Sequence, residues 1–417
     1  MALKAPDPVT ALRPKRRCDA GQSRQLSAPL KAAVRTQYRD HPSWSYQLHY
    51  DNLAVVVEQT PELGPLPSYA TLRRVMKAQG LTKRRRPRPQ RPGEAVAEHH
   101  QAQREVRSFE AEYVHALWHL DFHQSSRTVV LPDGRWVRPW MLGIVDDYSR
   151  LACHVQWYLS ESAQTLVHGL SQAIQKRALP RALLTDNGGA MLAEEVQQGL
   201  ERLSIVHQTT LPYSPYQNGK QEVFWSSVEG RLMAMLDGVA ELTLPRLNEA
   251  TQAWVELEYQ RKVHAELGCA PLKRVLDGRS VGRASPDSAT LRRAFRQQIQ
   301  RKQRRSDGTV TVHGCRFELP ARYRALDRVT LRYARWDLRR VDLIDPDTAQ
   351  VVGALYPLDK TANADGQRRR IALTEAETAT RGSGEIAPLL QQLLAEYAAS
   401  GLPPAYVPTD EEICDES

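Results

Sequence analysis

Cysteine is scarce in this chain of 417 residues, and the cysteines that occur are scattered. The sequence has five of them but no Cys-x-x-Cys pair and no spacing typical of a disulfide framework. This pattern argues against a structural zinc site and indicates a reducing compartment. The five are Cys18, Cys153, Cys269, Cys315 and Cys414.

Long apolar runs are missing as well. No stretch approaches the roughly 18–20 apolar residues that a membrane-spanning helix needs, and no signal peptide is evident. We therefore expect no membrane partner and a cytoplasmic location. A bacterial protein there would meet the chromosome directly and associate with the nucleoid.

Acidic residues are outnumbered by basic ones. The chain has 57 Lys plus Arg against 48 Asp plus Glu, which gives a net charge of +9. The excess is concentrated in patches, and this favours a polyanionic partner over a merely solvated surface. The chain is also too long for one ordinary core, so we expect two to four domains.

Residues 21–82 are predicted to form a small helical domain. Helices are expected at 30–38 and 45–59, and a third follows the N-cap Ser68 and stops at Gly80. The third helix keeps Arg73, Arg74 and Lys77 free to meet phosphate. Such a domain is typical of a helix-turn-helix DNA reader, although its basic face could simply be solvated.

The segment after this domain combines positive charge with proline. Lys83, Arg84, Arg85 and Arg86 precede repeated prolines, so neither a core nor a helix interior can form there. An extended linker that follows a phosphate backbone is the favoured interpretation, and a soluble linker is the alternative. A helix is expected at 98–112.

Residues 113–275 are expected to alternate strands and helices in the order βββαβαβα. This is the order of an RNase H-like fold, a mixed five-stranded sheet with flanking helices. Three acidic residues lie at well-marked places in it. Asp121 is on the first strand, Asp186 follows the short strand at 181–185, and Glu222 starts a long helix at 217–236.

The three acids predict a metal site. On the long helix Phe224 and Val228 begin an apolar stripe, so Glu222 faces away from the core. Carboxylates brought together from distant positions suit two Mg²⁺ ions for phosphoryl transfer, with Mn²⁺ as a possible substitute. Singly, Asp186 could instead close an Asp-Asn-Gly turn, and Glu222 could interact with the helix dipole.

These motifs resemble those of the DDE integrase/transposase superfamily. The resemblance rests on Trp-His-Leu-Asp at 118–121, Thr-Asp-Asn-Gly-Gly at 185–189, and Ser-Pro-Tyr-Gln-Asn-Gly-Lys-Gln-Glu at 214–222. The 35 residues between Asp186 and Glu222 equal the family's characteristic gap. Residues 190–191 depart from the family's usual acidic-aromatic pair, and the zinc module of retroviral integrases has no counterpart. The likeness therefore leans toward bacterial insertion-sequence and Mu-like transposases.

The resemblance implies an enzyme and its partners. We expect a DNA transposase that binds transposon ends, cleaves 3′ ends and joins them to target DNA. Double-stranded DNA and a homo-multimer are the implied partners, and Asp121, Asp186 and Glu222 are both the catalytic residues and the metal ligands. The alternatives are a two-metal nuclease without strand transfer and a domesticated DNA-binding regulator.

Two further family-like segments are interpreted as structural. In Val-Asp-Asp-Tyr-Ser-Arg at 145–150, Asp147 is expected to be structural, with Arg150 as its candidate partner. The segment 259–264 resembles a later family stretch with Gln260 in place of Asn. Its Arg261 and His264 could contact DNA or pack on the core.

The C-terminal third is predicted to add more DNA contacts. A very basic helix is expected at 291–305, followed by short strands that resemble the small β-barrel of Mu-like transposases. An amphipathic helix at 385–399 could pack back on the protein or dock a partner such as a helper ATPase. The predicted DNA contacts are Arg73, Arg74, Lys77, Lys83, Arg84, Arg85, Arg86, Lys220, Arg292, Arg296, Arg301, Lys302, Arg304 and Arg305.

The expected fold class is therefore multidomain α/β. The expected segments are a flexible basic arm (1–20), a helix-turn-helix-like domain (21–82), a basic linker and helix (83–112), an RNase H-like catalytic core (113–275), a basic helical linker (276–305), a small β-barrel (306–360), and a flexible tail with one amphipathic helix (361–417).

Overall fold

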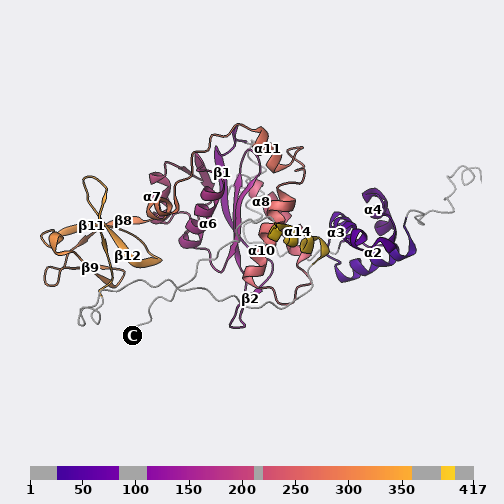
Figure 1. Cartoon of the computed structure of the whole chain (residues 1–417), viewed down its shortest axis with the longest axis horizontal. Coiled ribbons are helices and arrows are strands. Elements are labelled where there is room, and N and C mark those ends of the chain that lie inside the picture. Colours follow the sequence, from indigo (N-terminus) through magenta and orange to yellow (C-terminus); the bar gives the residue numbers. More distant parts are fainter. Residues whose placement is uncertain (1–25, 84–109, 211–218, 359–386, 400–417) are drawn as a thin grey trace, which may run out of the picture. The chain divides into compact units, whose positions relative to one another are not determined.

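The computed structural model describes residues 26–83, 110–210, 219–358 and 387–399 (Figure 1). The chain folds into two compact units. One unit consists of Met1–Gln90, Ser227–Ala240 and Gly384–Glu396, and the other contains the remaining chain. The helix expected at 98–112 lies almost wholly outside the described residues, and residues 110–112 are not helical.

The first unit is built on three N-terminal helices, each of which starts at a serine. Ser27, Ser45 and Ser68 accept a hydrogen bond from a backbone amide of the first helical turn. Gly80, at φ +70°, follows the third helix as expected. The three predicted helices are confirmed as α2 (Ala28–Asp40), α3 (Tyr46–Gln59) and α4 (Tyr69–Ala78), with a 3₁₀ turn η2 (Pro61–Leu63) between the last two.

Later segments of the chain complete this unit. They are the π-helix η4 (Val228–Leu232), α9 (Met233–Met235) and α14 (Pro388–Ala399). The buried Trp44 donates its indole N–H to the carbonyl of Ala234 at 2.7 Å, and the amide of Leu389 donates to the side chain of Asn52 at 3.0 Å. Leu390 and Leu393 of α14 are buried, so these apolar residues pack within the protein.

The second unit contains a mixed five-stranded sheet in the order β5-β4-β1-β6-β7. Strands β1, β4 and β5 form an antiparallel meander, while β6 and β7 run parallel to β1. This is the RNase H-like arrangement that the order of elements predicted. The strands are β1 (Leu117–Gln124), β4 (Trp140–Asp146), β5 (Ala152–Tyr158), β6 (Ala182–Thr185) and β7 (Val206–Thr209), with a small hairpin of β2 (Val129–Val130) and β3 (Trp136–Val137).

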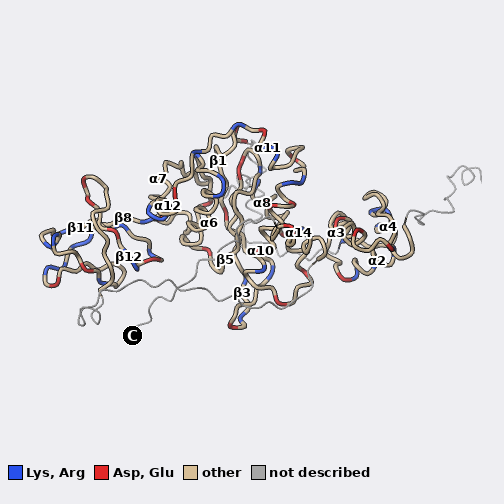
Figure 2. The backbone as a smooth tube through the Cα atoms, viewed as in Figure 1, with Lys and Arg blue, Asp and Glu red and all other residues tan. Residues whose placement is uncertain are grey.

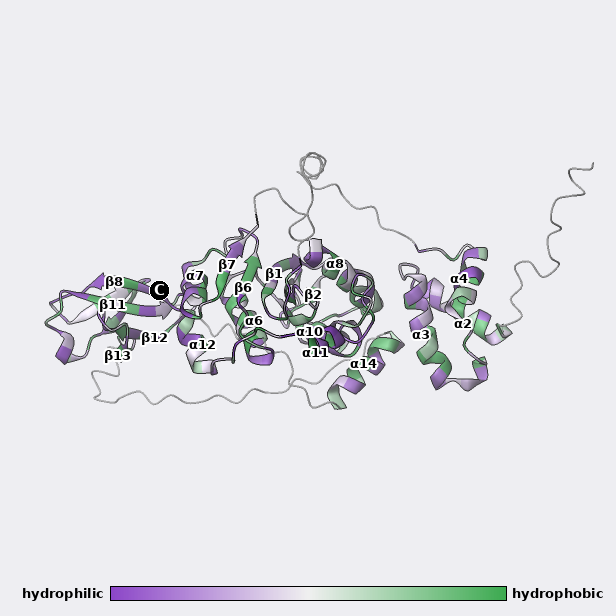
Figure 3. Cartoon of the chain, turned by 90° about the horizontal axis from the view of Figure 1, so that it is seen from above, coloured by the Kyte–Doolittle hydropathy of each residue, from purple (hydrophilic) through white to green (hydrophobic). Residues whose placement is uncertain are grey.

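Helices cover both faces of this sheet (Figure 1). Successive residues of a strand point to opposite faces, and Trp157 and Tyr158 show this on β5. The indole of Trp157 donates to Thr251 of α10 at 2.8 Å, whereas Tyr158 packs in the cluster that contains Leu166 of α6. Apolar residues concentrate in the central strands (Figure 3). The helices are α6 (Ala163–Lys176), α7 (Glu194–Arg202), α8 (Gly219–Ser227), α10 (Leu244–Trp254), the π-helix η5 (Val255–Tyr259), α11 (Pro271–Asp277) and α12 (Ser288–Ala294).

Side-chain amides from α10 and from the residue that follows the π-helix η5 bind the outer edge of β5. The side chain of Asn248 accepts from the amide of Trp157 at 2.7 Å and donates to the carbonyl of the same residue at 3.1 Å. Gln252 donates to the carbonyl of Val155, and Gln260 donates to that of Ala152 at 3.1 Å. Gln260 therefore has a structural role in the segment at 259–264.

The C-terminal part of the second unit consists of two small sheets around one apolar core. The four-stranded sheet has the order β13-β12-β11-β8, and β9 pairs with β10. Single bridges, Arg304 to Thr309 and Phe317 to Pro357, connect the two sheets at both ends, so the strands form a closed ring. The elements are β8 (Gln297–Lys302), β9 (Thr309–Val312), β10 (Cys315–Glu318), the 3₁₀ turn η6 (Ala321–Tyr323), β11 (Arg328–Ala334), β12 (Asp337–Ile344) and β13 (Val351–Leu355).

Two helix predictions are corrected by the structure. The basic helix expected at 291–305 ends at Ala294, and the chain continues as strand β8, because residues 297–302 pair along their whole length with β11. Glutamine and arginine favour helices intrinsically, but tertiary strand pairing overrides that preference. The long helix expected at 217–236 is not uniform, since α8 passes into the π-helix η4 at Val228.

Candidate active site

Asp121 lies on the central strand of the five-stranded sheet. It faces Gly143 of the neighbouring strand β4 in the antiparallel register. On the other side of β1, the parallel register with β6 pairs His119 with Leu184, which is two residues before Asp186. The two aspartates therefore lie at the same level of the sheet, Asp186 directly after the carboxyl end of β6 and Asp121 within β1.

Asp186 begins a loop that is fastened at several points. Its Oδ1 accepts the amide of Gly188 at 3.0 Å, and the side chain of Asn187 donates to the carbonyl of Thr210 at 2.8 Å. The turn interpretation of the Asp-Asn-Gly sequence is therefore confirmed. It does not compete with a role in binding, because the same carboxylate also lies within electrostatic reach of Asp121.

The pKa of Asp121 is affected by its burial and by the nearby charge of Asp186. Burial, and after it the negative charge of Asp186, raises this pKa to about 7. Hydrogen bonds from Trp225 and the backbone act in the opposite direction but do not cancel the effect. Two adjacent carboxylates in a partly buried place repel each other, and a bound cation would relieve that repulsion.

Helix α8 packs on the sheet beside Asp121. Its Gln221 donates to the carbonyl of Gly143 at 3.0 Å, and the side chain of Trp225 hydrogen-bonds to Asp121. The ring of Trp225 also stacks on His123, with centroids 5.5 Å apart. A Cβ atom on Gly143 would lie only 2.2 Å from the Trp225 ring, so a glycine is needed for this close approach.

Glu222 lies on the same helix and is exposed. The structure thus brings Asp121 and Asp186 together and places the third acid on the adjoining helix surface. Within the described residues, no three or more His, Cys, Asp or Glu side chains form a cluster that could hold a metal ion. Residues 211–218, immediately before α8, are outside the described part of the chain. The three-acid site accordingly remains a prediction.

One carboxylate near the site was missed from the sequence. A Cβ atom on Gly188 would lie 3.1 Å from an oxygen of Asp186 and 3.3 Å from an oxygen of Glu161. Burial, and then the charge of Asp186, raises the pKa of Glu161. Glu161 stands in a Ser-Glu-Ser sequence just before the capping residue Ser162 of α6, and such a position is common at ordinary helix starts.

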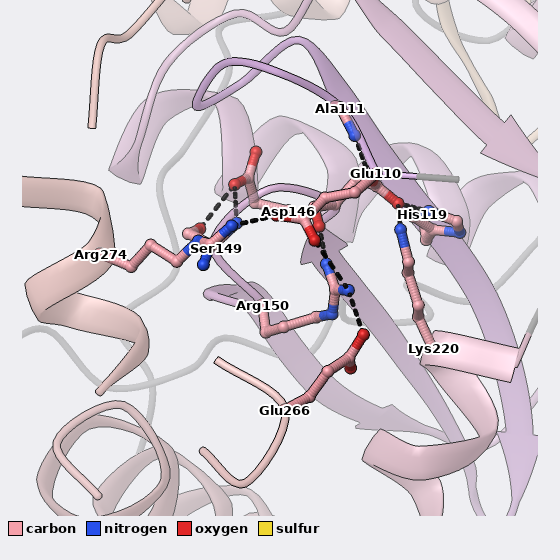
Figure 4. Close-up of polar contacts among 10 residues, drawn as sticks. Glu110, Ala111, His119, Asp146, Ser149, Arg150, Lys220, Glu266 and Arg274 are labelled. Atoms are coloured by element: carbon pink, nitrogen blue, oxygen red, sulfur yellow. Dashed lines mark hydrogen bonds and ion pairs between the residues drawn. The ribbon is translucent and has the colours of Figure 1, made fainter. Parts of the chain in front are cut away.

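A second polar network lies at the end of β4 (Figure 4). Asp147 is fully buried, and its carboxylate accepts from His119 at 2.6 Å, from the ammonium group of Lys220 at 2.5 Å and from the amide of Ala111 at 2.6 Å. Arg150 donates to the backbone carbonyl of Asp147 rather than to its carboxylate. The structural role predicted for Asp147 therefore holds, but its ionic partner is Lys220.

Most of the predicted DNA-contacting side chains in the described ranges are exposed. Figure 2 shows where Lys and Arg lie along the backbone. Arg296 differs, because it donates to Asp342 at 3.0 Å and keeps only 12% of its side chain exposed. Lys220 also differs through its bond to Asp147. Arg84, Arg85 and Arg86 lie outside the described residues. The exposed ones are Arg73, Arg74, Lys77, Lys83, Arg292, Arg301, Lys302, Arg304 and Arg305.

The order of the five strands, with Asp121 and Asp186 at the same level of β1 and β6, is that of an RNase H-like core. Residues 112–215 match the family model described as "Integrase core domain". This match supports a domain of the integrase and transposase superfamily in this part of the chain.

Curated relatives share a short stretch of sequence with this chain. The "IgE-binding protein" of Mus musculus is 37% identical over 81 residues, which are 19% of this chain and 14% of that protein. The Gag-Pro-Pol polyprotein of Human T-cell leukemia virus 3 (strain 2026ND) is 38% identical over 78 residues, or 19% of this chain and 5% of the polyprotein. The matches thus span only a small part of either relative.

Solved structures of integrases are also similar to this chain. The HTLV-2 integrase catalytic core domain in complex with magnesium is 19% identical, with a TM-score of 0.32, over 40% of this chain and 99% of that one. The simian T-cell lymphotropic virus intasome in complex with PP2A regulatory subunit B56 gamma is 14% identical, with a TM-score of 0.37, over 73% of this chain and 95% of that one.

None of the helices in the described ranges is long and apolar enough to cross a membrane.

Proposed function

We propose that this protein is a DNA transposase that cuts the ends of a mobile DNA element and joins their 3′ ends to target DNA. The observation that carries the proposal is the proximity of Asp121, on β1, to Asp186, directly after the parallel strand β6, in a domain that matches the integrase core family. Phosphoryl transfer needs little covalent chemistry from a protein, and positioned charge is its main requirement.

The residues present fit divalent metal ions. Mg²⁺ prefers oxygen ligands, and Asp186 lies close enough for its charge to raise the electrostatic cost of ionising Asp121. Asp121 and Asp186 would hold the metal, and Glu222 would complete the set from α8. When bound, two Mg²⁺ ions, or Mn²⁺ in their place, would activate the attacking water or 3′-hydroxyl and stabilise the leaving 3′ oxygen.

The chain's own residues orient this carboxylate pair. Trp225 donates to Asp121 and fixes the direction of its carboxylate, while the amide of Gly188 does the same for Asp186. Neither contact needs to form during the reaction, since both are present in the protein alone. Such preorganised groups keep the acids in place while the DNA strands are exchanged.

The flanking parts would hold the DNA. Helix α4 exposes Arg73, Arg74 and Lys77 from one face of its small domain, as in a helix-turn-helix reader. The C-terminal sheets expose a basic strand at Arg301 and Lys302. Transposon ends and target are both double-stranded DNA, and a homo-multimer would bring two ends together.

A strand-transfer assay tests the proposal. The end sequence is first selected from a random pool of duplexes by binding to the protein. The selected duplex, pre-cut at its 3′ end, is then incubated with a supercoiled plasmid and Mg²⁺. We expect joined products from the wild type, and a loss of about a thousandfold or more in Asp121→Asn, Asp186→Asn and Glu222→Gln.

The matched control is Asp133→Asn in the turn between β2 and β3. Asp133 is exposed and pairs with Arg135, so this change should leave joining at the wild-type rate. Wild-type activity in Asp186→Asn would overturn the catalytic role. Cleavage without joining would favour the nuclease, and DNA binding without either reaction would favour the regulator.

A further inference from the structure

The contact between Lys220 and Asp147 connects the segments that carry Asp121 and Glu222, two acids of the proposed site. Lys220 lies two residues before Glu222 at the start of α8, and His119 lies two residues before Asp121 on β1. Both side chains donate to the same oxygen of Asp147, at 2.5 and 2.6 Å. The carboxylate of Asp147 therefore connects strand β1, which carries Asp121, to helix α8, which carries Glu222. Figure 4 shows the side chains of His119 and Lys220 in this network.

This carboxylate is held firmly by its surroundings. The side chain of Asp147 is 0% exposed, and its second oxygen accepts the amide of Ala111. Its backbone is also fixed, because its amide donates to the carbonyl of Leu117 and its carbonyl accepts from Arg150. A buried acceptor on a fixed backbone is a rigid anchor for whatever binds to it.

The anchor sets the rotation of α8 about its own axis. Residues two apart on a helix point about 200° away from each other, so a lysine directed into the protein turns Glu222 toward the outside. Glu222 is indeed exposed, while Gln221 between them reaches the carbonyl of Gly143. The direction of the third acid thus depends on where Lys220 is held.

We propose that Lys220, Asp147 and His119 form a positioning contact that orients Glu222, and that Lys220 acts through Asp147 rather than by binding DNA. The ammonium group of Lys220 is committed to a buried carboxylate, and only 17% of its side chain is exposed. By contrast, the exposed basic residues of α4 can reach a phosphate without first breaking an ion pair. This inference rests on the proposed function, since it concerns the orientation of one of the proposed catalytic acids.

The test compares Lys220→Met, Asp147→Asn and the double variant in the full-length protein. Joining of the selected, pre-cut duplex is measured in single turnover at saturating DNA, and DNA affinity is measured by fluorescence anisotropy over a range of salt. We expect each single variant to join DNA about 10- to 100-fold more slowly, with affinity unchanged within about twofold. The double variant should be no more than about threefold slower than the slower single, because both changes remove the same contact.

Lys273→Met is the matched control. Lys273 also pairs with an aspartate, Asp277, but on an exposed surface of α11, so its loss should leave both rate and affinity at wild-type values. A Lys220→Met variant that binds DNA about tenfold more weakly with a reduced salt slope, beside an unaffected Asp147→Asn, would show a direct phosphate contact and overturn the proposal. Wild-type joining in both single variants would overturn it as well.

Two further variants separate folding from positioning. If thermal melting shows Asp147→Asn to be unfolded, Lys220→Arg is compared with Lys220→Met: recovery of the rate at equal DNA affinity supports the positioning contact, and equal rates in Lys220→Met and the wild type refute it. Asp121→Asn identifies failure of the underlying function. If that variant joins DNA like the wild type, the proposed transposase chemistry is wrong, whatever Lys220 does.

Discussion

The side chain of Trp225 on α8 hydrogen-bonds to the carboxylate of Asp121, and it reaches that position across the bare backbone of Gly143. The three residues come from a helix and two neighbouring strands. The proposed first metal ligand thus depends on a residue that has no side chain.

Gly143→Ala should therefore damage the site. The added methyl group would lie 2.2 Å from the Trp225 ring, and neither the ring nor the strand can give way cheaply. We expect a loss of stability of about 1–3 kcal/mol and a fall in joining rate of about 100-fold, because the bond to Asp121 is displaced. Urea unfolding and the joining assay measure the two effects. Gly230→Ala is the control, since a Cβ there meets nothing within 4 Å; equal behaviour of the two variants would contradict the explanation.

Asp121→Asn should stabilise the metal-free protein at high pH. The pKa of Asp121 is raised to about 7, so between about pH 4 and pH 7 the folded state keeps a proton that the unfolded state has released. Stability consequently falls as pH rises through this window, and asparagine removes the loss. We expect Asp121→Asn to be more stable than the wild type by about 1–2 kcal/mol at pH 8, and not at pH 4.

Urea unfolding with a chelator at both pH values measures this difference. The raised pKa of Asp121 would correspond to a larger stability difference than the one we expect. The expected difference is smaller because the Asp121 side chain is partly exposed and solvent screens the repulsion. A constant difference between the two proteins across the whole pH range would show that the proximity of Asp186 and the burial do not act on Asp121 as described.

Asp147→Asn should destabilise the protein at neutral pH, whereas Asp121→Asn should stabilise it at high pH. Burial alone would raise the pKa of Asp147, but the hydrogen bonds from His119, Lys220 and Ala111 outweigh it and hold this pKa at about 2. The ionised carboxylate therefore stabilises the fold above about pH 4, and the contribution is lost as pH falls toward 2. We expect Asp147→Asn to lose about 2–3 kcal/mol at pH 7 and less at pH 3. An equal loss at both values would indicate a packing effect instead.

Arg335→Ala should weaken the attachment of the C-terminal sheets to the core. Glu195 of α7 is 0% exposed and accepts two hydrogen bonds from Arg335, at 2.7 and 2.9 Å. Removing the arginine leaves a buried carboxylate without these partners, at a cost of about 2–4 kcal/mol in urea unfolding. Arg305→Ala, which breaks an exposed pair with Asp327, should cost less than about 1 kcal/mol. If Arg335→Ala and Arg305→Ala lowered stability by similar amounts, burial of Glu195 would not explain the strength of its contact with Arg335.

Local signals in the sequence predicted much of this fold. The N-cap Ser68 marks the start of α4 correctly, and the alternation of strand and helix segments gives the five-stranded core. Strand β8 was missed because its glutamines and arginines favour a helix locally, whereas its pairing with β11 is a long-range interaction.

The acids of the site were easier to find than the residues that support them. Asp121 and Asp186 lie where strand ends are expected, and their proximity follows from the parallel pairing of β1 and β6. Glu161 and the partnership of Asp147 with Lys220 depend on segments 25 and 73 residues away along the chain, and no local pattern encodes such a distance. Arg150, the nearest basic residue in the sequence, was the natural choice of partner for Asp147, but it binds the backbone carbonyl of Asp147 and not its carboxylate.

The amide side chains along β5 have a consequence for the protein at high concentration. An edge strand normally exposes a row of unpaired amides and carbonyls, on which a strand of another molecule can add and begin an aggregate. Asn248, Gln252 and Gln260 bind such groups on β5. Under the proposed function, in which several copies gather on one DNA molecule, these contacts would protect an edge of the central sheet from irreversible association between the copies.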